Sequence, residues 1–123
     1  MRVAVNAKSA YDLYLTRNLQ RAKLHRAPTI DASYELFVKD KLDVLAGLKP
    51  RLVMDAEKLP GSRVLEGRFS AVQQSIGTPQ GRPAGAKYLR EFAEDAKASG
   101  FVAKSIERNA VRGVSVAPKA PAS

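Results

Sequence analysis

Two lysines in this sequence stand beside the start of a helix, and each follows a short apolar strand. Lys8 precedes Ser9 in the first segment, and Lys49 precedes Pro50 in the second. A helix N-terminus carries backbone N–H groups without intrahelical acceptors and a partial positive charge, so it favours anions. If the two strands are parallel in one sheet, both helix starts open at its carboxyl edge, where α/β proteins bind ligands. The spacing predicts a binding cleft and does not by itself indicate catalysis.

Residues for other kinds of chemistry are few. The chain has one histidine and no cysteine, which excludes disulfides and thiol catalysis. We expect His25 to lie at the surface or in packing, because no nucleophile elbow accompanies it. The Gly77 to Gly81 segment lacks the Lys-Ser/Thr ending of a phosphate loop, and the sequence holds no cluster of metal ligands. We therefore expect no enzyme, no cofactor and no metal site.

The first half of the chain alternates between strands and helices. A buried strand is predicted at Val3–Asn6, followed by a helix that Ser9 caps, with Asp12 in the capping-box position. A weaker strand at Lys23–Arg26 is expected to be parallel and near an edge, because it carries charge. The remaining elements of this half are a helix capped by Asp31 or Ser33, a strand at Leu42–Ala46, and a short helix begun by Pro50.

The second half is predicted to hold two strands and two helices. The strands are expected at Arg63–Glu66 and Phe69–Ser75, before a loop dense in turn-forming residues. The longest helix is expected at Ala84–Ala98, and Gly100 in the left-handed conformation is expected to end it. A last helix is predicted at Val102–Asn109.

The order of these elements predicts a three-layer α/β domain, with a mostly parallel sheet flanked by helices. We divide the chain into an α/β lobe at 1–76, a helical segment at 77–110 and a tail at 111–123. The tail is expected to be disordered, because its prolines and small residues cannot bury enough surface to offset the ordering entropy.

The composition is that of a globular chain with a strong positive charge. Apolar residues make up 45% of the 123 residues, and no run approaches the roughly 18 of a membrane span. Twenty-one basic and twelve acidic residues give a net charge of +9, which favours anionic partners. A basic run could bind nucleic acid through phosphates, but it has no interleaved aromatic residues for base stacking. The run comprises Arg17, Arg21, Lys23 and Arg26.

Four segments together form a pattern in their order and spacing. They are the strand–turn–helix Val3–Leu15, the segment Ser33–Gly47, the segment Gly67–Val72, and the closing helices from Tyr88 to Ile106. In this order the chain from Arg2 to about Asn109 resembles the second half of bacterial extracellular solute-binding protein family 3. Members of that family are the periplasmic receptors of ABC-type amino-acid importers.

The resemblance implies one lobe of a type II periplasmic-binding-protein fold. In the family, two lobes close on a small solute and deliver it to a membrane permease. Only the second lobe and the trailing helices are represented here, and the first lobe would supply an arginine for the ligand carboxylate. No signal peptide precedes the first strand, so the chain is either cytoplasmic or a piece of a longer, periplasmic protein.

The resemblance also implies a ligand site at the two turns. Ser9, with the backbone of Lys8 and Ala10, stands where the family binds its ligand carboxylate; alternatively, Ser9 is only an N-cap worth about 1 kcal/mol. Leu48 stands where the family has an aspartate, and leucine cannot hold an α-ammonium group. The expected ligand is therefore a small anionic or amino-acid-like solute, with an anionic or non-amino one favoured. The expected ligand-binding residues are Asn6, Lys8, Ser9, Ala10, Leu48 and Lys49.

The closing helices leave an alternative open. In the family they pack on the first lobe, so here their apolar faces must find another surface. Burying each such side chain is worth about 1.5–3 kcal/mol. We expect them to pack on the same chain's sheet or across a dimer, and a free-standing dimerising module without solute binding is the alternative to a receptor lobe. The faces comprise Tyr88, Leu89, Phe92, Val102 and Ile106.

Overall fold

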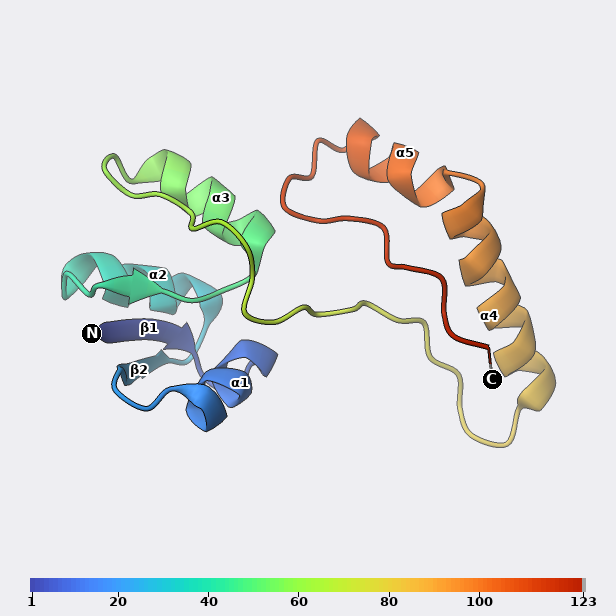
Figure 1. Cartoon of the computed structure of the whole chain (residues 1–123), viewed down its shortest axis with the longest axis horizontal. Helices are drawn as coiled ribbons and strands as arrows, with labels where there is room; N and C mark the ends of the chain where they lie inside the picture. The colour runs from blue at the N-terminus through green and yellow to red at the C-terminus, as the bar shows by residue number, and fades with distance from the viewer. Residues whose placement is uncertain (123) are drawn as a thin grey trace. The chain divides into compact units, whose positions relative to one another are not determined.

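Three strands and five helices make up the described part of the chain, which in this computed structural model is residues 1–122 (Figure 1). The chain divides into two compact units, 1–72 and 73–123, and each is described by itself. The first unit holds all three strands and three helices, and the second holds two helices. The boundary between the two units falls after residue 72.

The first unit is built on a parallel sheet with the strand order β2-β1-β3. Strand β1 spans Arg2–Asn6, β2 spans Lys23–Ala27 and β3 spans Val44–Leu45. Strand β2 lies at an edge and runs parallel to β1, as its charged residues predicted. The predicted α/β class with a parallel sheet is therefore confirmed.

A helix follows each strand. Helix α1 spans Ala10–Asn18, α2 spans Ile30–Lys39 and α3 spans Lys49–Lys58. Helix α2 packs across all three strands, and α1 contacts β1. Because every helix starts after the carboxyl end of a parallel strand, the three helix N-termini lie toward the same edge of the sheet (Figure 1).

The core of this unit centres on β1. Val3, Ala4 and Val5 are all buried, and Val5 is completely inaccessible to solvent. As the middle strand of a parallel sheet it is covered on both faces, which explains its unbroken apolar run. Tyr11 and Leu15 pack against it from successive turns of α1.

The helix caps agree with the sequence at α1 and differ at α2. Ser9 caps α1 as predicted, and its Oγ accepts a hydrogen bond from the Asp12 N–H at 3.1 Å. The cap of α2 is Thr29, not Asp31 or Ser33, because the Thr29 Oγ1 accepts from the Ala32 N–H at 3.0 Å. Ser33 is instead buried inside the helix, where its hydroxyl donates to the Ile30 carbonyl.

Strand formation is more limited than the sequence suggests. The strand expected at Leu42–Ala46 pairs only at Val44–Leu45, and the strands expected at Arg63–Glu66 and Phe69–Ser75 are absent from the described residues. A strand needs a neighbour, and β3 is an edge strand only two residues long. The side chains of the segment 65–72 are exposed, although the Phe69 ring lies 5.5 Å from the ring of Tyr14.

The second unit is helical. Helix α4 spans Pro83–Ala98 and α5 spans Phe101–Arg108, and Gly100 between them adopts φ +80°, as predicted for the helix stop. None of the described residues of this unit is buried. Residues 111–122 form neither helix nor strand, and the predicted tail residue Ser123 lies outside the described residues. The tail is held to α4 by a hydrogen bond from the Lys97 Nζ to the carbonyl of residue 118 at 2.8 Å.

An ion pair ties β1 to the residue before β3. The Arg2 N–H donates to the Asp43 Oδ2 at 2.6 Å, and the Arg2 Nε lies 3.6 Å from the same atom. The backbone hydrogen bond from Arg2 lowers the pKa of Asp43 below its ordinary value of 3.8.

This pair predicts a pH dependence of stability. A folded-state pKa below the unfolded value stabilises the fold above about pH 4, and that contribution is lost as the pH falls through the lower folded-state pKa. We expect the urea midpoint of the Asp43→Asn variant to fall less than that of the wild type between about pH 5 and about pH 2.5. Equal falls in both proteins would contradict the assignment.

Candidate functional site

The two predicted turns lie at one edge of the sheet. Strands β1 and β3 are parallel neighbours, with Ala4 opposite Leu45, so their carboxyl ends are adjacent. The structure therefore brings the turn at residues 6–10 and the turn at residues 46–49 to the same edge, as the sequence predicted. Asn6 ends β1, and Ala10 and Lys49 are the first residues of α1 and α3.

The β1–α1 turn is held by its own hydrogen bonds. The Ser9 Oγ donates to the Asn6 carbonyl at 2.7 Å, so its proton is already engaged. Lys8 adopts φ +62°, a left-handed conformation that its own backbone N–H helps to hold by donating to the Asp12 Oδ2 at 2.9 Å. The Asn6 Oδ1 is buried and has no hydrogen-bond partner among residues 1–122. Ser9 is an N-cap here, and its hydroxyl could donate to an anionic solute only by giving up the bond to the Asn6 carbonyl.

Asp12 is a residue whose role sequence reasoning missed. It is only 5% exposed, and its carboxylate accepts from the Arg26 Nε at 2.9 and 3.2 Å as well as from the Lys8 N–H. The capping-box position suggested a bond back to Ser9; the left-handed Lys8 turns its own N–H to the carboxylate instead. A negative charge thus lies in the first turn of α1 and satisfies the anion preference of that helix start.

A substitution at this position separates the two roles of the carboxylate. We expect Asp12→Asn to lower the free energy of unfolding by about 1–2 kcal/mol, because the amide has no charge to pair with Arg26 and one acceptor oxygen in place of the two that serve Arg26 and the Lys8 N–H. We also expect the variant to bind small anions more tightly at the β1–α1 turn. Urea unfolding and anion titration test the two effects, with the exposed Glu35→Gln as the control; an unchanged anion affinity would contradict the second.

The first turn of α3 holds no acidic residue of its own. Leu48 is the N-cap of α3, is 39% exposed and makes no side-chain cap hydrogen bond. The turn contains Lys49, Pro50 and Arg51. Of the two cationic side chains in this turn, Arg51 is paired with Asp31 and Asp55, so Lys49 is the one that reinforces the positive end of the helix.

The two cations differ in their surroundings. The Arg51 Nη2 lies 2.6 Å from Asp31, and its Nε donates to both carboxylate oxygens of Asp55 at 2.9 and 3.0 Å. The hydrogen bonds that Arg51 donates to Asp55 and then to Asp31 raise the pKa of Arg51, and its charge is balanced within the lobe. No ion pair within residues 1–122 involves Lys8 or Lys49, and both side chains are exposed.

A small pocket lies among the helix starts. Its lining includes Tyr11 of α1, Ser33 of α2 and Leu48 and Asp55 of the β3–α3 segment. Its free volume is about 10 Å³, room for about one water molecule. A solute cannot enter it, so any solute at this edge rests on the surface of the two turns.

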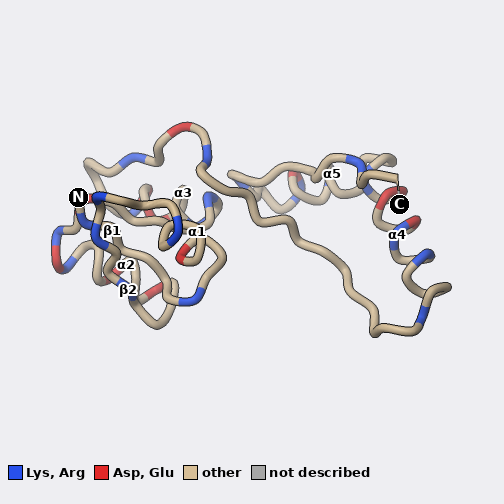
Figure 2. Tube along the Cα trace, turned by 60° about the horizontal axis from the view of Figure 1, so that its bottom comes forward, with Lys and Arg blue, Asp and Glu red and all other residues tan. Residues whose placement is uncertain are grey.

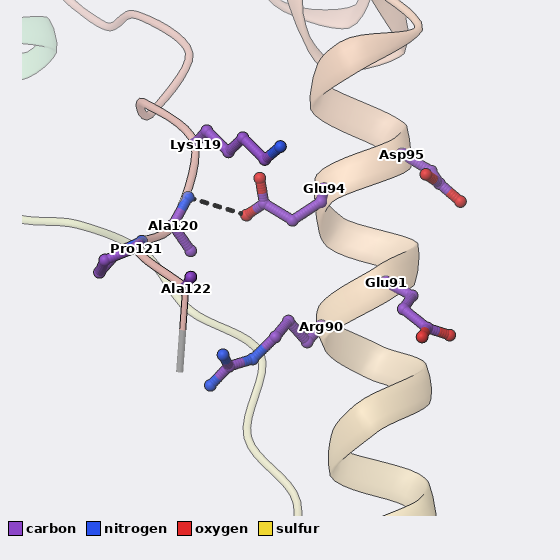
Figure 3. Close-up of a pocket in the computed structure, with 8 residues that line it drawn as sticks. All are labelled: Arg90, Glu91, Glu94, Asp95, Lys119, Ala120, Pro121 and Ala122. Carbon is purple, nitrogen blue, oxygen red and sulfur yellow. Dashed lines mark hydrogen bonds between the residues drawn. The ribbon is translucent and has the colours of Figure 1, made fainter.

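A larger open groove belongs to the second unit (Figure 3). It measures about 600 Å³ and lies between α4 and residues 119–122. The Glu94 carboxylate accepts from the Ala120 N–H at 3.3 Å and lies 2.6 Å from the Lys97 Nζ, and the bond from Lys97 lowers the pKa of Glu94. Both acidic and basic side chains line the groove. None of the residues that the sequence predicted to bind a ligand lies in it.

His25 lies on β2 opposite Ala4, half-buried, and its Nε2 has no hydrogen-bond partner among the described residues. Arg26, counted in the basic run, pairs with Asp12. Lysines and arginines are spread over both units (Figure 2).

Within residues 1–122 no group of three or more His, Asp or Glu side chains could hold a metal. No described helix is long and apolar enough to cross a membrane.

Comparison with protein-family models, with curated proteins and with solved structures found no match to this chain.

Proposed function

We propose that residues 1–72 are a solute-binding lobe of the type II periplasmic-binding-protein kind, and that the chain represents the second lobe of an ABC-importer receptor. The observation that supports this proposal most is the meeting of the two lysine-bearing turns at one edge of a parallel sheet. Topology alone brings the turns that carry Lys8 and Lys49 to this edge, although 41 positions separate the two residues in the sequence. An importer receptor would place the parent protein in the periplasm.

The proposed ligand is a small anion, and its main contact is the β3–α3 turn. There Lys49 is the first residue of a helix whose first turn holds no acidic residue, and the Lys49 ammonium group has no ion-pair partner among the described residues. At the β1–α1 turn the Asp12 carboxylate already occupies the helix start, so that turn contributes Lys8 as a flanking charge. Leu48 offers no group for an ammonium ion, which favours a dicarboxylate or inorganic anion over an α-amino acid.

A single lobe leaves one side of the solute in water. We therefore expect weak binding, with a Kd of about 1 mM, which corresponds to about −4 kcal/mol. A first lobe, which the resemblance implies for the receptor, would raise the affinity by enclosing the solute and excluding water from these contacts.

Nuclear magnetic resonance of the ¹⁵N-labelled full chain tests this function. Succinate, L-glutamate and inorganic phosphate are titrated at low salt, with sodium chloride of equal ionic strength as the reference. We expect saturable amide shifts at Leu48 and Lys49, weaker ones at Lys8–Ala10, and larger effects for succinate or phosphate than for glutamate. Shifts that do not saturate, or that follow the exposed lysines and arginines generally, would contradict a solute site.

The second candidate function is a dimerising interaction module, and one observation favours it. The aromatic side chains Tyr88, Phe92 and Phe101 of the second unit are all at least half exposed. This candidate concerns a different unit, so it can hold together with solute binding by the lobe. The basic-run hypothesis of nucleic-acid binding gains no such support, because Arg26 is engaged with Asp12.

A further inference from the structure

The C-terminal segment lies along α4, where two side chains hold it by its backbone. The Lys97 Nζ donates to the carbonyl of Pro118 at 2.8 Å. The Glu94 carboxylate accepts from the Ala120 N–H at 3.3 Å (Figure 3). The later residue of the segment thus contacts the earlier residue of the helix, so the segment runs antiparallel to α4. Neither bond involves a side chain of the segment.

Glu94 and Lys97 act as one pair on α4. Their charged groups lie 2.6 Å apart, and their side chains are only 24% and 19% exposed. The Lys87–Glu91 pair of the same helix has its charged groups 3.9 Å apart, and its side chains are 78% and 61% exposed. At about 100° per residue, Glu94 and Lys97 fall within about 60° of each other around the helix. The covered pair therefore offers an acceptor and a donor side by side, to an N–H and a carbonyl two residues apart.

The composition of the segment suits binding through its backbone. Pro118 and Pro121 have no N–H, so Lys119 and Ala120 carry the backbone donors of residues 118–121. Proline also restricts the unbound chain, and docking therefore costs less conformational entropy. The expected disorder of the tail followed from the small apolar surface that it can bury. Hydrogen bonds to charged groups are stronger than neutral ones and are a different source of order.

We propose that Glu94 and Lys97 form a main-chain clamp for an extended segment, and that residues 118–120 of the same chain are its occupant. The tail is then a strap that closes this side of α4 to other ligands while it is docked. Because the clamp contacts backbone atoms, side chains of the strap can change without loss of docking. This inference concerns the second unit and stands independently of solute binding by the first.

Relaxation measurements by nuclear magnetic resonance on the full chain test the helix side of the clamp. We expect a backbone order parameter of about 0.8 for Ala120 in the wild type, and a fall below about 0.6 in Lys97→Met, which keeps the aliphatic stem but removes the donor. Lys87→Met is the matched control, because it removes the lysine of the exposed pair on the same helix, and it should leave the value unchanged. A wild-type value below about 0.6, or equal values in the two variants, would overturn the proposal.

Substitutions of Ala120 test the tail side of the clamp and leave α4 untouched. Ala120→Pro removes the N–H that Glu94 accepts, and we expect the order parameter of the Lys119 amide to fall from about 0.8 to below about 0.6. Ala120→Ser changes the side chain but keeps the N–H, and should leave Lys119 ordered. An ordered Lys119 in Ala120→Pro would refute the clamp. Ordering that rises with protein concentration would also refute it, because the occupant would then be the tail of a second copy.

Discussion

Arg51→Ala is expected to lower the free energy of unfolding by about 3 kcal/mol, because it leaves a buried carboxylate without its partner. Asp55 is only 4% exposed, and Arg51 donates to both of its oxygens. The same arginine joins Asp31 near the start of α2 to α3, so its loss also separates two helix starts at the proposed ligand-binding edge. Urea unfolding of the full chain measures the change.

Two further variants identify the cause of that loss. Arg51→Lys keeps the charge but cannot make the bidentate hydrogen bond to Asp55. We expect it to lower the free energy of unfolding by an intermediate amount. Arg63→Ala removes an exposed arginine outside the helices and should change stability by no more than about 0.5 kcal/mol. If Arg51→Ala and Arg63→Ala changed the free energy of unfolding equally little, the Arg51–Asp55 pair would not stabilise the fold.

Leu15→Ala is expected to cost about 3 kcal/mol by leaving a cavity between α1 and β1. Leu15 is buried in the core cluster with Val3, Val5 and Tyr11. The substitution keeps a good helix former, so the loss comes from packing and not from helix propensity.

Leu13→Ala on the same helix provides the matched control. The Leu13 side chain is exposed, and its truncation should change stability by no more than about 0.5 kcal/mol. Thermal or urea unfolding distinguishes the two leucines directly. Similar losses for both would mean that α1 is not packed on the sheet through the face described here.

Local signals in the sequence predicted the elements that depend on few residues. The apolar run Val3–Asn6 predicted the central strand, Ser9 predicted the start of α1, and Gly100 predicted the end of α4. Each of these features depends on backbone conformation or on hydrogen bonds within one turn. The parallel order that brings the two lysine-bearing turns together followed from the alternation of strands and helices.

The features that sequence reasoning missed depend on distant partners. Thr29 caps α2, although Asp31 and Ser33 are also good N-cap residue types. The prediction missed Thr29 because three candidate residues within five positions cannot be ranked from sequence alone. The pairing of Asp12 with Arg26 requires β2 beside β1 and could not be read from either residue.

The two absent strands have a similar explanation. The segments 63–66 and 69–75 have suitable residue types for strands, but no neighbouring strand pairs with them in the described part of the chain. Strand propensity reflects packing on a sheet as much as an intrinsic backbone preference. Because β3 is only two residues long, it has few backbone groups with which another strand could pair.

The β3–α3 turn is the proposed main anion contact, and one comparison of two lysine variants tests this role most directly. The Kd of the tightest-binding of succinate, glutamate and phosphate is measured for Lys49→Ala and for Lys8→Asn, since asparagine tolerates the left-handed conformation of residue 8. We predict that Lys49→Ala raises the Kd about tenfold, the equivalent of about 1.4 kcal/mol, and that Lys8→Asn raises it less than about threefold. The reverse order, or no effect of Lys49→Ala, would contradict the account.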